Sequence, residues 1–376
     1  MILKPLTEFC TVNMGQSPDS KTYNDHGNGI PFYQGNADFG EIHPETRVWC
    51  SAPVKIAEAG DILISVRAPI GAMNIAVERC CIGRGLAALT PISEKCGKQF
   101  LYYALQSKVE SLIAQGTGST FKAISKKVLE ATLIPAYSTR EQEQITATIS
   151  HVYRAIAARR DQLVLLDQLV KSRFIELFGD PIRNEKGWPI VTLGEVAEIR
   201  IGPFGSLLHK EDYIVGGHAL VNPSHIIDGN ICTDDKLTVS DEKYEELSAY
   251  RLSIGDLILG RRGEMGRCAV VYEDGLLCGT GSIIIRPKEK MKPYFLQNII
   301  SSPGYKRIIE DKAVGVTMMN LNVPIVSSLT IPLLPIDMQE QFIAFMQQTD
   351  KSKMAVQQGL QELEILKKSL MQQYFG

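Results

Sequence analysis

The sequence lacks the signatures of several protein classes. Its eight cysteines form no C-x-x-C pair and its six histidines form no H-E-x-x-H motif, so their spacing predicts no metal site. We expect these thiols to be buried or reduced structural residues. No apolar run approaches the roughly 18 residues that span a bilayer, and MILKPLTEFC has no apolar stretch of a signal peptide. These absences favour a cytoplasmic protein without a membrane partner.

Catalytic motifs and a basic excess are missing as well. Residues 222–225 (NPSH) lack the aromatic residue of the N-P-P-Y motif of amino-methyltransferases, and residues 116–120 (GTGST) lack the G-x-x-x-x-G-K-[ST] frame of a phosphate loop. No nucleophile with a base and an orienting group can be assembled, so we expect no enzyme activity. The formal net charge of −2 differs from the basic excess usual in proteins that hold duplex DNA alone. DNA binding would therefore use local patches or a basic partner.

What the sequence does contain is a long internal repeat. Its 376 residues suggest two or three domains, and a hydrophobic content of 44% is typical of a soluble globular protein. LTEFCTVNMG from Leu6 aligns with LGEVAEIRIG from Leu193, and GDILISVRAPIGAMNIA from Gly60, which reads as two strands and a tight turn, aligns with GDLILGRRGEMGRCAVV from Gly255. The offset grows from 187 to 195 residues, so the second copy carries an insertion between residues 203 and 255. A repeat this long is a duplicated domain and not a solenoid.

An apolar stripe with heptad spacing follows the Q-E-Q motif of each copy. Its apolar members are Ile145, Ile149, Val152, Ile156, Leu163, Leu166 and Val170 in the first copy, and Phe342, Met346, Val356, Leu360, Leu363 and Leu370 in the second. The second stripe is interrupted at Thr349, Lys353 and Lys367. So long and narrow a stripe suits a partner helix, and we expect the two helices to pair as an antiparallel coiled coil. The alternative is that each helix packs on its own domain.

Helix start and stop signals give the expected organisation of the chain. Ser138 and Asp337, each followed three residues later by glutamate, are spaced as capping boxes, and Gly179 and Gly376 are placed as helix ends. The expected segments are a first domain at 1–140, a long helix at 141–179, a linker at 180–189, a second domain at 190–337 and a second long helix at 338–376. About 36 residues at ~1.5 Å each would make a spacer of roughly 54 Å.

Polar and basic loops lie between the predicted strands of both copies. Arg, Lys, Asn and Gln side chains read base edges, whereas Ser, Thr and backbone N–H groups hold phosphates. The candidate DNA-binding residues are Gln16, Ser17, Lys21, Tyr33, Gln34, Arg67, Arg84, Thr117, Ser119, Thr120 and Lys122 in the first copy, and Phe204, Ser206, Lys210, Asn222, Arg261, Arg262, Thr280, Thr317 and Asn320 in the second. A solvated turn is the alternative interpretation of each residue. Because the loops share little sequence while the frame is kept, we expect each copy to read a different target.

The residues that carry a resemblance to a known family are LFGDPIRNEKGWPIVTLGEVAEI at 177–199, GDILISVRAPIG, IGRGLAAL and the two Q-E-Q helices. Through them the chain closely resembles the specificity subunit of Type I restriction-modification systems. The resemblance covers essentially the whole chain, including the repeat. It implies an α+β fold in which two similar mixed α/β target recognition domains, in a pseudo-two-fold arrangement, are joined by two long helices in an antiparallel coiled coil. Each domain would read one half of an asymmetric bipartite site on double-stranded DNA.

The same resemblance implies partners and the place of the cofactors. Two methyltransferase (modification) subunits would dock on the long helices, and restriction/translocase subunits would join them. S-adenosylmethionine, Mg and ATP are then expected only in those partner subunits, with no cofactor bound by this chain. Two alternatives stay open: a self-sufficient adenine methyltransferase with a fused recognition part, and a coiled-coil scaffold with two protein-binding modules.

Overall fold

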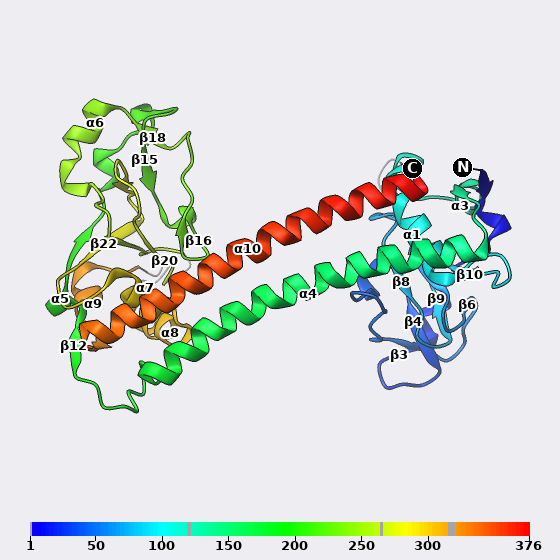
Figure 1. Cartoon of the computed structure of the whole chain (residues 1–376), viewed down its shortest axis with the longest axis horizontal. Helices are drawn as coiled ribbons and strands as arrows, with labels where there is room; N and C mark the ends of the chain where they lie inside the picture. Colours follow the sequence, from blue (N-terminus) through cyan, green and yellow to red (C-terminus); the bar gives the residue numbers. More distant parts are fainter. Residues whose placement is uncertain (1, 119–121, 264–265, 315–319) are drawn as a thin grey trace. The chain divides into compact units, whose positions relative to one another are not determined.

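The protein forms two compact units. The computed structural model describes residues 2–118, 122–263, 266–314 and 320–376 (Figure 1). Unit 1 comprises Met1–Gln162 with Val356–Gly376, and unit 2 comprises Leu163–Ala355. Each unit therefore holds one globular domain together with segments of both long helices.

The described residues of the unit 1 domain form three sheets and six short helices. Its strands are β1 (Leu3–Pro5), β2 (Cys10–Met14), β3 (Tyr23–Asn24), β4 (Ile30–Tyr33), β5 (Trp49–Cys50), β6 (Ile56–Ala57), β7 (Ile62–Ser65), β8 (Met73–Ile75), β9 (Cys80–Ile82), β10 (Leu86–Pro91) and β11 (Leu133–Pro135). Its helices are η1 (Leu6–Glu8), η2 (Ser20–Thr22), η3 (Asn36–Asp38), α1 (Lys98–Ser107), α2 (Val109–Ala114) and α3 (Lys126–Ala131). The sheet orders are β2-β10-β7-β8, β3-β5-β4-β9-β6 with β4 parallel to β9, and β1-β11.

The domain of unit 2 repeats this topology. Its strands are β12 (Ile190–Thr192), β13 (Ala197–Ile201), β14 (Tyr213–Ile214), β15 (His218–Val221), β16 (Ile226–Ile227), β17 (Asn230–Ile231), β18 (Thr238–Val239), β19 (Leu257–Gly260), β20 (Cys268–Val270), β21 (Leu277–Cys278), β22 (Ser282–Pro287) and β23 (Thr330–Pro332). Its helices are α5 (Leu193–Val196), η4 (Gly205–Leu207), η5 (Lys210–Asp212), η6 (Pro223–His225), α6 (Asp241–Glu246), η7 (Ser248–Tyr250), α7 (Pro293–Ser301), α8 (Pro303–Lys312) and α9 (Val323–Ser327). The orders β13-β22-β19-β20 and β12-β23, and the parallel pair β15-β21, match those of unit 1. This agreement confirms the duplicated domain.

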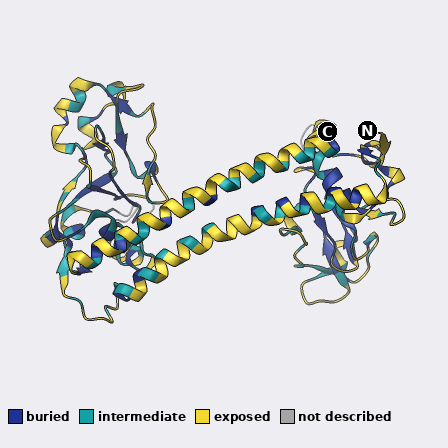
Figure 2. Cartoon of the chain, viewed as in Figure 1, coloured by how far each residue is buried: buried dark blue, intermediate teal, exposed yellow. Residues whose placement is uncertain are grey.

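Strand alternation divides each main sheet between two cores. On β19, Leu257 and Leu259 pack in the core that contains α7, α8 and α9, whereas Ile258 packs with residues of the second sheet. β7 shows the same alternation in unit 1. Figure 2 shows these central strands as the most buried parts of each unit. Burial on both faces explains why these strands read as continuous apolar runs.

The repeated Gly-Asp pair has a structural cause. Gly60 and Gly255 adopt φ values of +92° and +91°, a region open to glycine. The buried carboxylates of Asp61 and Asp256 each accept a hydrogen bond from the backbone N–H three residues upstream, at 2.9 and 2.8 Å. β7 pairs antiparallel with β8, and β19 with β20, so the predicted hairpins are confirmed.

Two long helices, α4 (Thr139–Phe178) and α10 (Ile336–Phe375), pack together in antiparallel fashion. In unit 1 the Tyr137 hydroxyl, just before α4, donates to the carbonyl of Tyr374 at 3.0 Å, and Arg160 pairs with Glu364 at 2.8 Å. Residue numbers thus rise along one helix and fall along the other. This arrangement is the expected antiparallel coiled coil.

The same direction holds for the helix segments of unit 2. Lys353 Nζ lies 2.5 Å from Asp167 Oδ1, and the Arg173 guanidinium lies 5.9 Å from the ring centroid of Phe345. Phe342 belongs to the core of this unit. The helices therefore pack on the globular domain as well as on each other, so the alternative interpretation holds in part.

The predicted stripe residues are enclosed. The buried ones are Ile145, Ile149, Val152, Ile156, Phe342 and Val356, and the half-buried ones are Leu163, Leu166, Val170, Met346, Leu360, Leu363 and Leu370. At the interruptions, the Thr349 hydroxyl donates to the carbonyl of Phe345 at 3.0 Å. Lys353 pairs with Asp167 as described, and Lys367 pairs with Glu364 at 2.9 Å. Each polar interruption thus has a partner.

The two helix starts differ from each other. The Ser138 hydroxyl accepts from the Glu141 backbone N–H at 3.4 Å, while the Glu141 carboxylate accepts from the Ser138 backbone N–H at 2.8 Å, so this capping box is confirmed. The second predicted box is wrong. α10 begins at Ile336, which places Asp337 inside the helix, and the Glu340 carboxylate pairs with Lys292 at 2.6 Å instead.

Seven cysteines are buried, and burial raises the pKa of Cys10, Cys80 and Cys96 to about 12. Cys232, which follows the hairpin β16–β17, is exposed, and all eight cysteines are free thiols, as the prediction of buried or reduced residues allows. Within the described residues, no group of three His, Cys, Asp or Glu side chains is placed to hold a metal ion. No helix in the described part of the chain has the length and apolar character needed to cross a bilayer.

Candidate nucleic-acid interface

Backbone hydrogen bonds gather the candidate loops of unit 1 at one edge of its sheets. Gly15 N–H donates to the carbonyl of Leu86 at 2.9 Å, and Val66 N–H donates to the carbonyl of Gly85 at 2.9 Å. A Cβ on Gly15 would lie 2.1 Å from the carbonyl oxygen of Gly83, so only glycine permits this approach. We call the segments 15–17, 33–36, 65–71, 83–85, 116–118 and 122–124 the loop edge of unit 1.

Unit 2 builds the same loop edge with matching hydrogen bonds. Gly202 N–H donates to the carbonyl of Ser282, and Arg261 N–H to the carbonyl of Gly281, both at 3.0 Å. A Cβ on Gly202 would lie 2.2 Å from the carbonyl oxygen of Gly279. The loop edge of unit 2 comprises 202–207, 222–225, 260–263, 266–267, 279–282, 314 and 320–322. The frame that presents the loops is therefore duplicated down to its backbone contacts.

Most candidates of unit 1 lie on its loop edge. The exposed ones are Gln16, Gln34, Arg67, Arg84, Thr117 and Lys122. Ser17 is half-buried, and its hydroxyl accepts from the Arg84 backbone N–H at 3.3 Å. Tyr33 belongs to the loop edge but is buried, with its hydroxyl 2.7 Å from that of Thr46, and Lys21 lies elsewhere, in η2. Ser119 and Thr120 lie outside the described residues.

The candidates of unit 2 are less uniformly exposed. Phe204, Ser206 and Arg262 are exposed on the loop edge, and Lys210 is exposed in η5. Asn222, Thr280 and Asn320 are half-buried and Arg261 is buried, at 6% exposure. Thr317 lies outside the described residues. The exposed set therefore contains fewer polar side chains than that of unit 1.

Side chains at equivalent positions of the two loop edges mostly differ. The β-bridge between Arg67 and Ala123 in unit 1 is equivalent to the β-bridge between Arg262 and Asn320 in unit 2. The two units therefore share an exposed arginine at this position. The differing pairs, unit 1 first, are Gln34 and Asn222, Val66 and Arg261, Arg84 and Thr280, and Ala123 and Asn320. One frame thus presents two different chemical surfaces.

The NPSH segment is a structural turn. His225 is buried, and its Nδ1 lies 2.8 Å from the carbonyl oxygen of Leu220 and 3.3 Å from the backbone nitrogen of Asn222. These contacts hold η6 against β15. The histidine is therefore used inside the domain.

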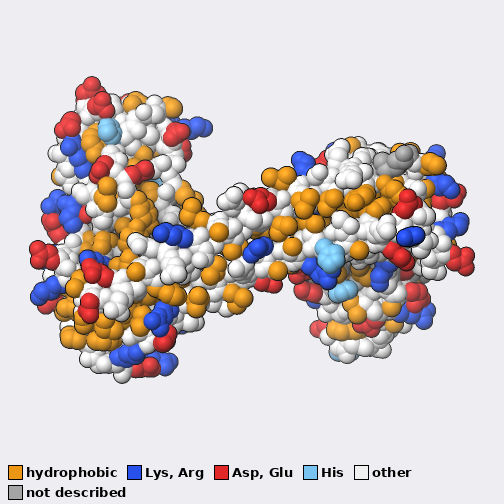
Figure 3. All heavy atoms as spheres, viewed as in Figure 1, with side chains coloured by type: hydrophobic (Ala, Val, Ile, Leu, Met, Phe, Trp, Pro, Cys, Tyr) orange, Lys and Arg blue, Asp and Glu red, His pale blue; other side chains and the backbone are white. Residues whose placement is uncertain are grey.

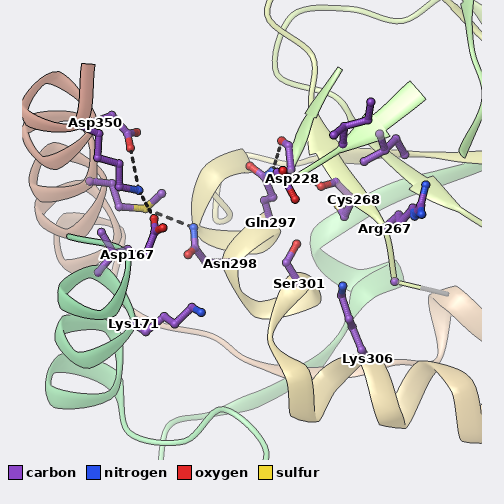
Figure 4. Close-up of a pocket in the computed structure, with 17 residues that line it drawn as sticks. Asp167, Lys171, Asp228, Arg267, Cys268, Gln297, Asn298, Ser301, Lys306 and Asp350 are labelled. Atoms are coloured by element: carbon purple, nitrogen blue, oxygen red, sulfur yellow. Dashed lines mark hydrogen bonds and ion pairs between the residues drawn. The ribbon is translucent and has the colours of Figure 1, made fainter. Parts of the chain in front are cut away.

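Each unit also has a cleft beside the long helices. In unit 2 a cleft of about 630 Å³ lies between α4, α7, α8, α10 and the hairpin β16–β17 (Figure 4). In unit 1 a cleft of about 520 Å³ lies between α1, α4 and α10. Their linings include equivalent positions of the repeat, unit 1 first: Gln106 and Ser301, Tyr153 and Asp350, Glu364 and Asp167, Lys367 and Val170, and Lys368 and Lys171. The duplication therefore repeats the cleft as well as the loop edge.

The profile of a known family covers both copies. "Type I restriction modification DNA specificity domain" matches residues 3–165 and again residues 185–365. The chain belongs to this family. The two matches coincide with the two copies of the repeat, so each copy is one specificity domain.

Relatives of this specificity-domain protein carry corresponding names. The MjaX type I restriction enzyme specificity subunit of Methanocaldococcus jannaschii is 40% identical over 167 residues, covering 44% of this chain and 39% of that protein. The MjaIX specificity subunit of the same organism is 23% identical, covering 70% of this chain and 66% of its own length. The EcoBI specificity subunit of Escherichia coli is 20% identical, and the match covers 84% of this chain and 73% of that protein. The chain thus spans less than two thirds of the first two relatives.

Solved structures support the same fold for this specificity-domain protein. The type I restriction-modification S subunit of M. genitalium has a TM-score of 0.57 at 15% identity, covering all of this chain and 96% of that one. A second match has a TM-score of 0.67 at 18% identity and covers 100% of this chain and 97% of the other. It comes from a structural study of complex assembly and conformational transition in the type I restriction-modification system. At these identities the likeness concerns the fold.

Two residues of the specificity domains escaped the sequence prediction. Gln142 and Gln339, the first glutamines of the two Q-E-Q motifs, are almost fully buried. The Gln142 side chain accepts from Gly97 N–H at 3.0 Å and donates to the carbonyl of Lys95 at 2.9 Å. Gln339 accepts from Lys292 N–H at 2.9 Å. Each glutamine fastens a long helix to its domain, and the repetition of Q-E-Q was the available signal.

Surface charge on this specificity-domain protein is mixed. On the face shown in Figure 3, basic and acidic side chains alternate over each unit, in keeping with the net charge of −2. That face carries no single basic field that would hold DNA by itself.

Proposed function

We propose that this protein is the non-catalytic sequence-recognition subunit of a Type I restriction-modification enzyme. Its domains, residues 1–140 and 190–337, each read one half of an asymmetric bipartite site on double-stranded DNA. The observation that carries this proposal is the pair of loop edges, which share backbone hydrogen bonds but differ in most side chains. Because the same backbone arrangement presents different side chains in the two units, each unit can contact a different base sequence.

The exposed arginines and lysines of the loop edges make the DNA contacts in this proposal. Arg67 and Arg262 occupy the same position in both units and are exposed. An arginine at this position can hold a phosphate or read a guanine. Replacing Lys122 or Arg262 by alanine therefore lowers the affinity of the assembled enzyme for its site. Wild-type binding and methylation by both variants would reject this choice of loops.

The partners in this proposal are two methyltransferase subunits and restriction/translocase subunits, in the cytoplasm. S-adenosylmethionine, Mg and ATP belong to those subunits. The long helices support a docking role because they keep large apolar side chains in solvent. These include Val164, Leu165 and Leu169 on α4, and Ile365 and Leu366 on α10, with exposed fractions from 45% to 69%. Exposed apolar groups of this size mark protein interfaces.

Genome-wide adenine methylation tests the proposal. A host expresses the chain with and without a cognate methyltransferase subunit, and modified adenines are mapped. We expect a bipartite, asymmetric motif only when both proteins are present. Methylation with this chain alone would instead indicate a fused methyltransferase, and no methylation in either case would favour a scaffold.

The linking helices set the gap between the half-sites in this proposal. Inserting one heptad into both α4 and α10 keeps the apolar stripes in phase. We expect the insertion to lengthen the gap in the methylated motif while both half-sites stay the same. An unchanged gap would remove the spacer role without affecting the recognition role.

A further inference from the structure

The cleft of unit 2 contains two cations without partners. Lys171 on α4 and Lys306 on α8 line it, and neither ammonium makes a hydrogen bond or ion pair with any residue that the structure describes. Ser301, at the end of α7, lines the same cleft, and its hydroxyl also makes no hydrogen bond within the described chain. In Figure 4, Ser301 lies between Lys171 and Lys306. Two cations and a hydroxyl form a set of donors without an acceptor.

Packing fixes the position of Lys306. Gly266 has a φ of +76°, and a Cβ there would lie 2.7 Å from Cγ of Lys306. The lysine stem therefore lies against the backbone of the turn that joins β19 to β20. The ammonium also acts on Cys268, whose thiol pKa is raised by burial and lowered in part by this charge. Lys306 is thus held at the cleft wall by its own stem.

The acidic groups of the cleft are mostly engaged elsewhere. Asp167 and Asp350 both pair with Lys353, at 2.5 and 3.6 Å. Asp228 lies at the tip of the hairpin β16–β17 and is exposed. Lys171 and Lys306 are therefore left as positive charges that the cleft does not neutralise.

The equivalent cleft of unit 1 lacks this arrangement. Lys368 corresponds to Lys171, but Gln106 stands where unit 2 has Ser301. Glu110 lines this cleft, and Lys367 pairs with Glu364. The basic donor set is therefore specific to unit 2, although the cleft itself is duplicated.

We propose that the unit-2 cleft binds a phosphate of the DNA backbone next to the half-site read by unit 2. Lys171, Lys306 and the Ser301 hydroxyl donate to the phosphate oxygens. The inference rests on the proposed function and adds to it a contact that carries no sequence information. The turn after β19 supports this assignment, because Arg262, Gly266 and Arg267 all belong to the loop edge and the last two also line the cleft. One turn thus borders both a base-reading surface and a backbone-binding surface.

A salt titration of the assembled enzyme tests this contact. Binding of wild type, Lys171→Ala, Lys306→Ala and the double variant to a duplex with the methylated motif is measured across a range of salt. Each phosphate contact contributes about 0.9 to the slope of log K against log[salt]. Because both lysines hold the same phosphate, we expect the double variant to reduce the slope by about 0.9 and each single variant by a part of that value, with the motif unchanged.

Matched variants separate charge from structure. Lys171→Arg and Lys306→Arg keep the positive charge, so we expect them to retain the wild-type slope. Lys368→Ala, at the position equivalent to Lys171, should leave the slope unchanged. An unchanged slope in the double variant would overturn the proposal, and so would an altered motif, because the lysines would then read bases. A wild-type enzyme that makes no motif would instead reject the proposed function itself.

Free phosphate compounds distinguish the source of the ligand. The complex is titrated with inorganic phosphate and with ATP, and the thermal midpoint of the chain is followed. A DNA backbone site predicts no shift at millimolar concentrations. A shift that Lys171→Ala and Lys306→Ala abolish, together with an unchanged salt slope, would assign the cleft to a free nucleotide or phosphate and overturn the proposal.

Discussion

The two copies of the domain use the same buried aspartate in different ways. Asp61 in unit 1 and Asp256 in unit 2 both accept a backbone hydrogen bond after the left-handed glycine. Asp256 also accepts from Arg286 Nε and Nη2, both at 2.7 Å, and is only 1% exposed. Unit 1 has Thr90 at the position of that arginine. The hydrogen bond from the backbone N–H to the aspartate is therefore common to both units, whereas the ion pair with arginine is found in unit 2.

A second difference lies at the loop edges. Val66 in unit 1 is buried and apolar, whereas Arg261 in unit 2 is buried with its Nε lacking a hydrogen-bond partner among the described residues. Burial and the charge of Arg262 lower the pKa of Arg261. Unit 1 has a valine at this position, so the fold does not require a cation here. The buried arginine therefore makes unit 2 less stable than a valine would. Such losses of stability are expected where a surface serves binding.

The largest effect in this comparison should come from the aspartates. Asp256→Ala removes a buried, doubly bonded partner of Arg286, and we expect it to lower the local stability of unit 2 by about 3 kcal/mol. Asp61→Ala loses a single backbone bond, with an expected loss of about 1 kcal/mol in unit 1. Hydrogen exchange of β19 and β7 measures each value separately. Equal losses would show that the arginine adds nothing.

The glutamines of the Q-E-Q motifs should behave alike, since their contacts are shared. Gln142→Ala and Gln339→Ala each leave buried backbone groups without a partner, with an expected loss of about 2 kcal/mol in the respective unit. Gln144→Ala and Gln341→Ala are the controls, because these glutamines are exposed, and should change stability by less than about 0.5 kcal/mol. Chemical denaturation followed by hydrogen exchange gives all four values. A large loss of stability in one unit alone would show that the two glutamines have different structural roles.

Arg261→Val converts unit 2 to the residue of unit 1. We expect unit 2 to become more stable by about 1 kcal/mol, because an unsatisfied buried group is removed. Because Arg261 is a candidate DNA contact, the affinity of the assembled enzyme should fall. Urea unfolding and duplex binding are measured on the same variant. Reduced stability would mean that the arginine is a structural residue.

These comparisons show which features the sequence could predict. The repeated Gly-Asp, the apolar strands and the heptad stripes encode local conformation and periodicity, so the duplicated frame and both long helices follow from them. The helices begin at Thr139 and Ile336, two residues before the expected starts. The second cap was misplaced because Glu340 is drawn to Lys292, a residue far away in the sequence.

Tertiary contacts explain what the sequence could not predict. R-R-G reads as an exposed turn, yet Arg261 is enclosed because its backbone pairs with Gly281 and Leu321. Gln142 is buried only because it meets Gly97 at the start of α1. The unit-2 cleft likewise requires Lys171 and Lys306 to meet from separate helices. No pattern along the chain records these neighbours.

The smallest expected effect compares the two helix stripes. Lys353 stands where the first stripe has Ile156, and it is 23% exposed between Asp167 and Asp350, which are 59% and 60% exposed. Exposed ion pairs contribute little, and both carboxylates can be hydrated without the lysine. Lys353→Ile should therefore raise stability by about 0.5 kcal/mol, whereas Lys353→Ala should lower it by less than about 0.5 kcal/mol. Hydrogen exchange in the middle of α10 measures both, and a loss above 1 kcal/mol for the isoleucine variant would show that the pairs with Asp167 and Asp350 fix the register of the helices.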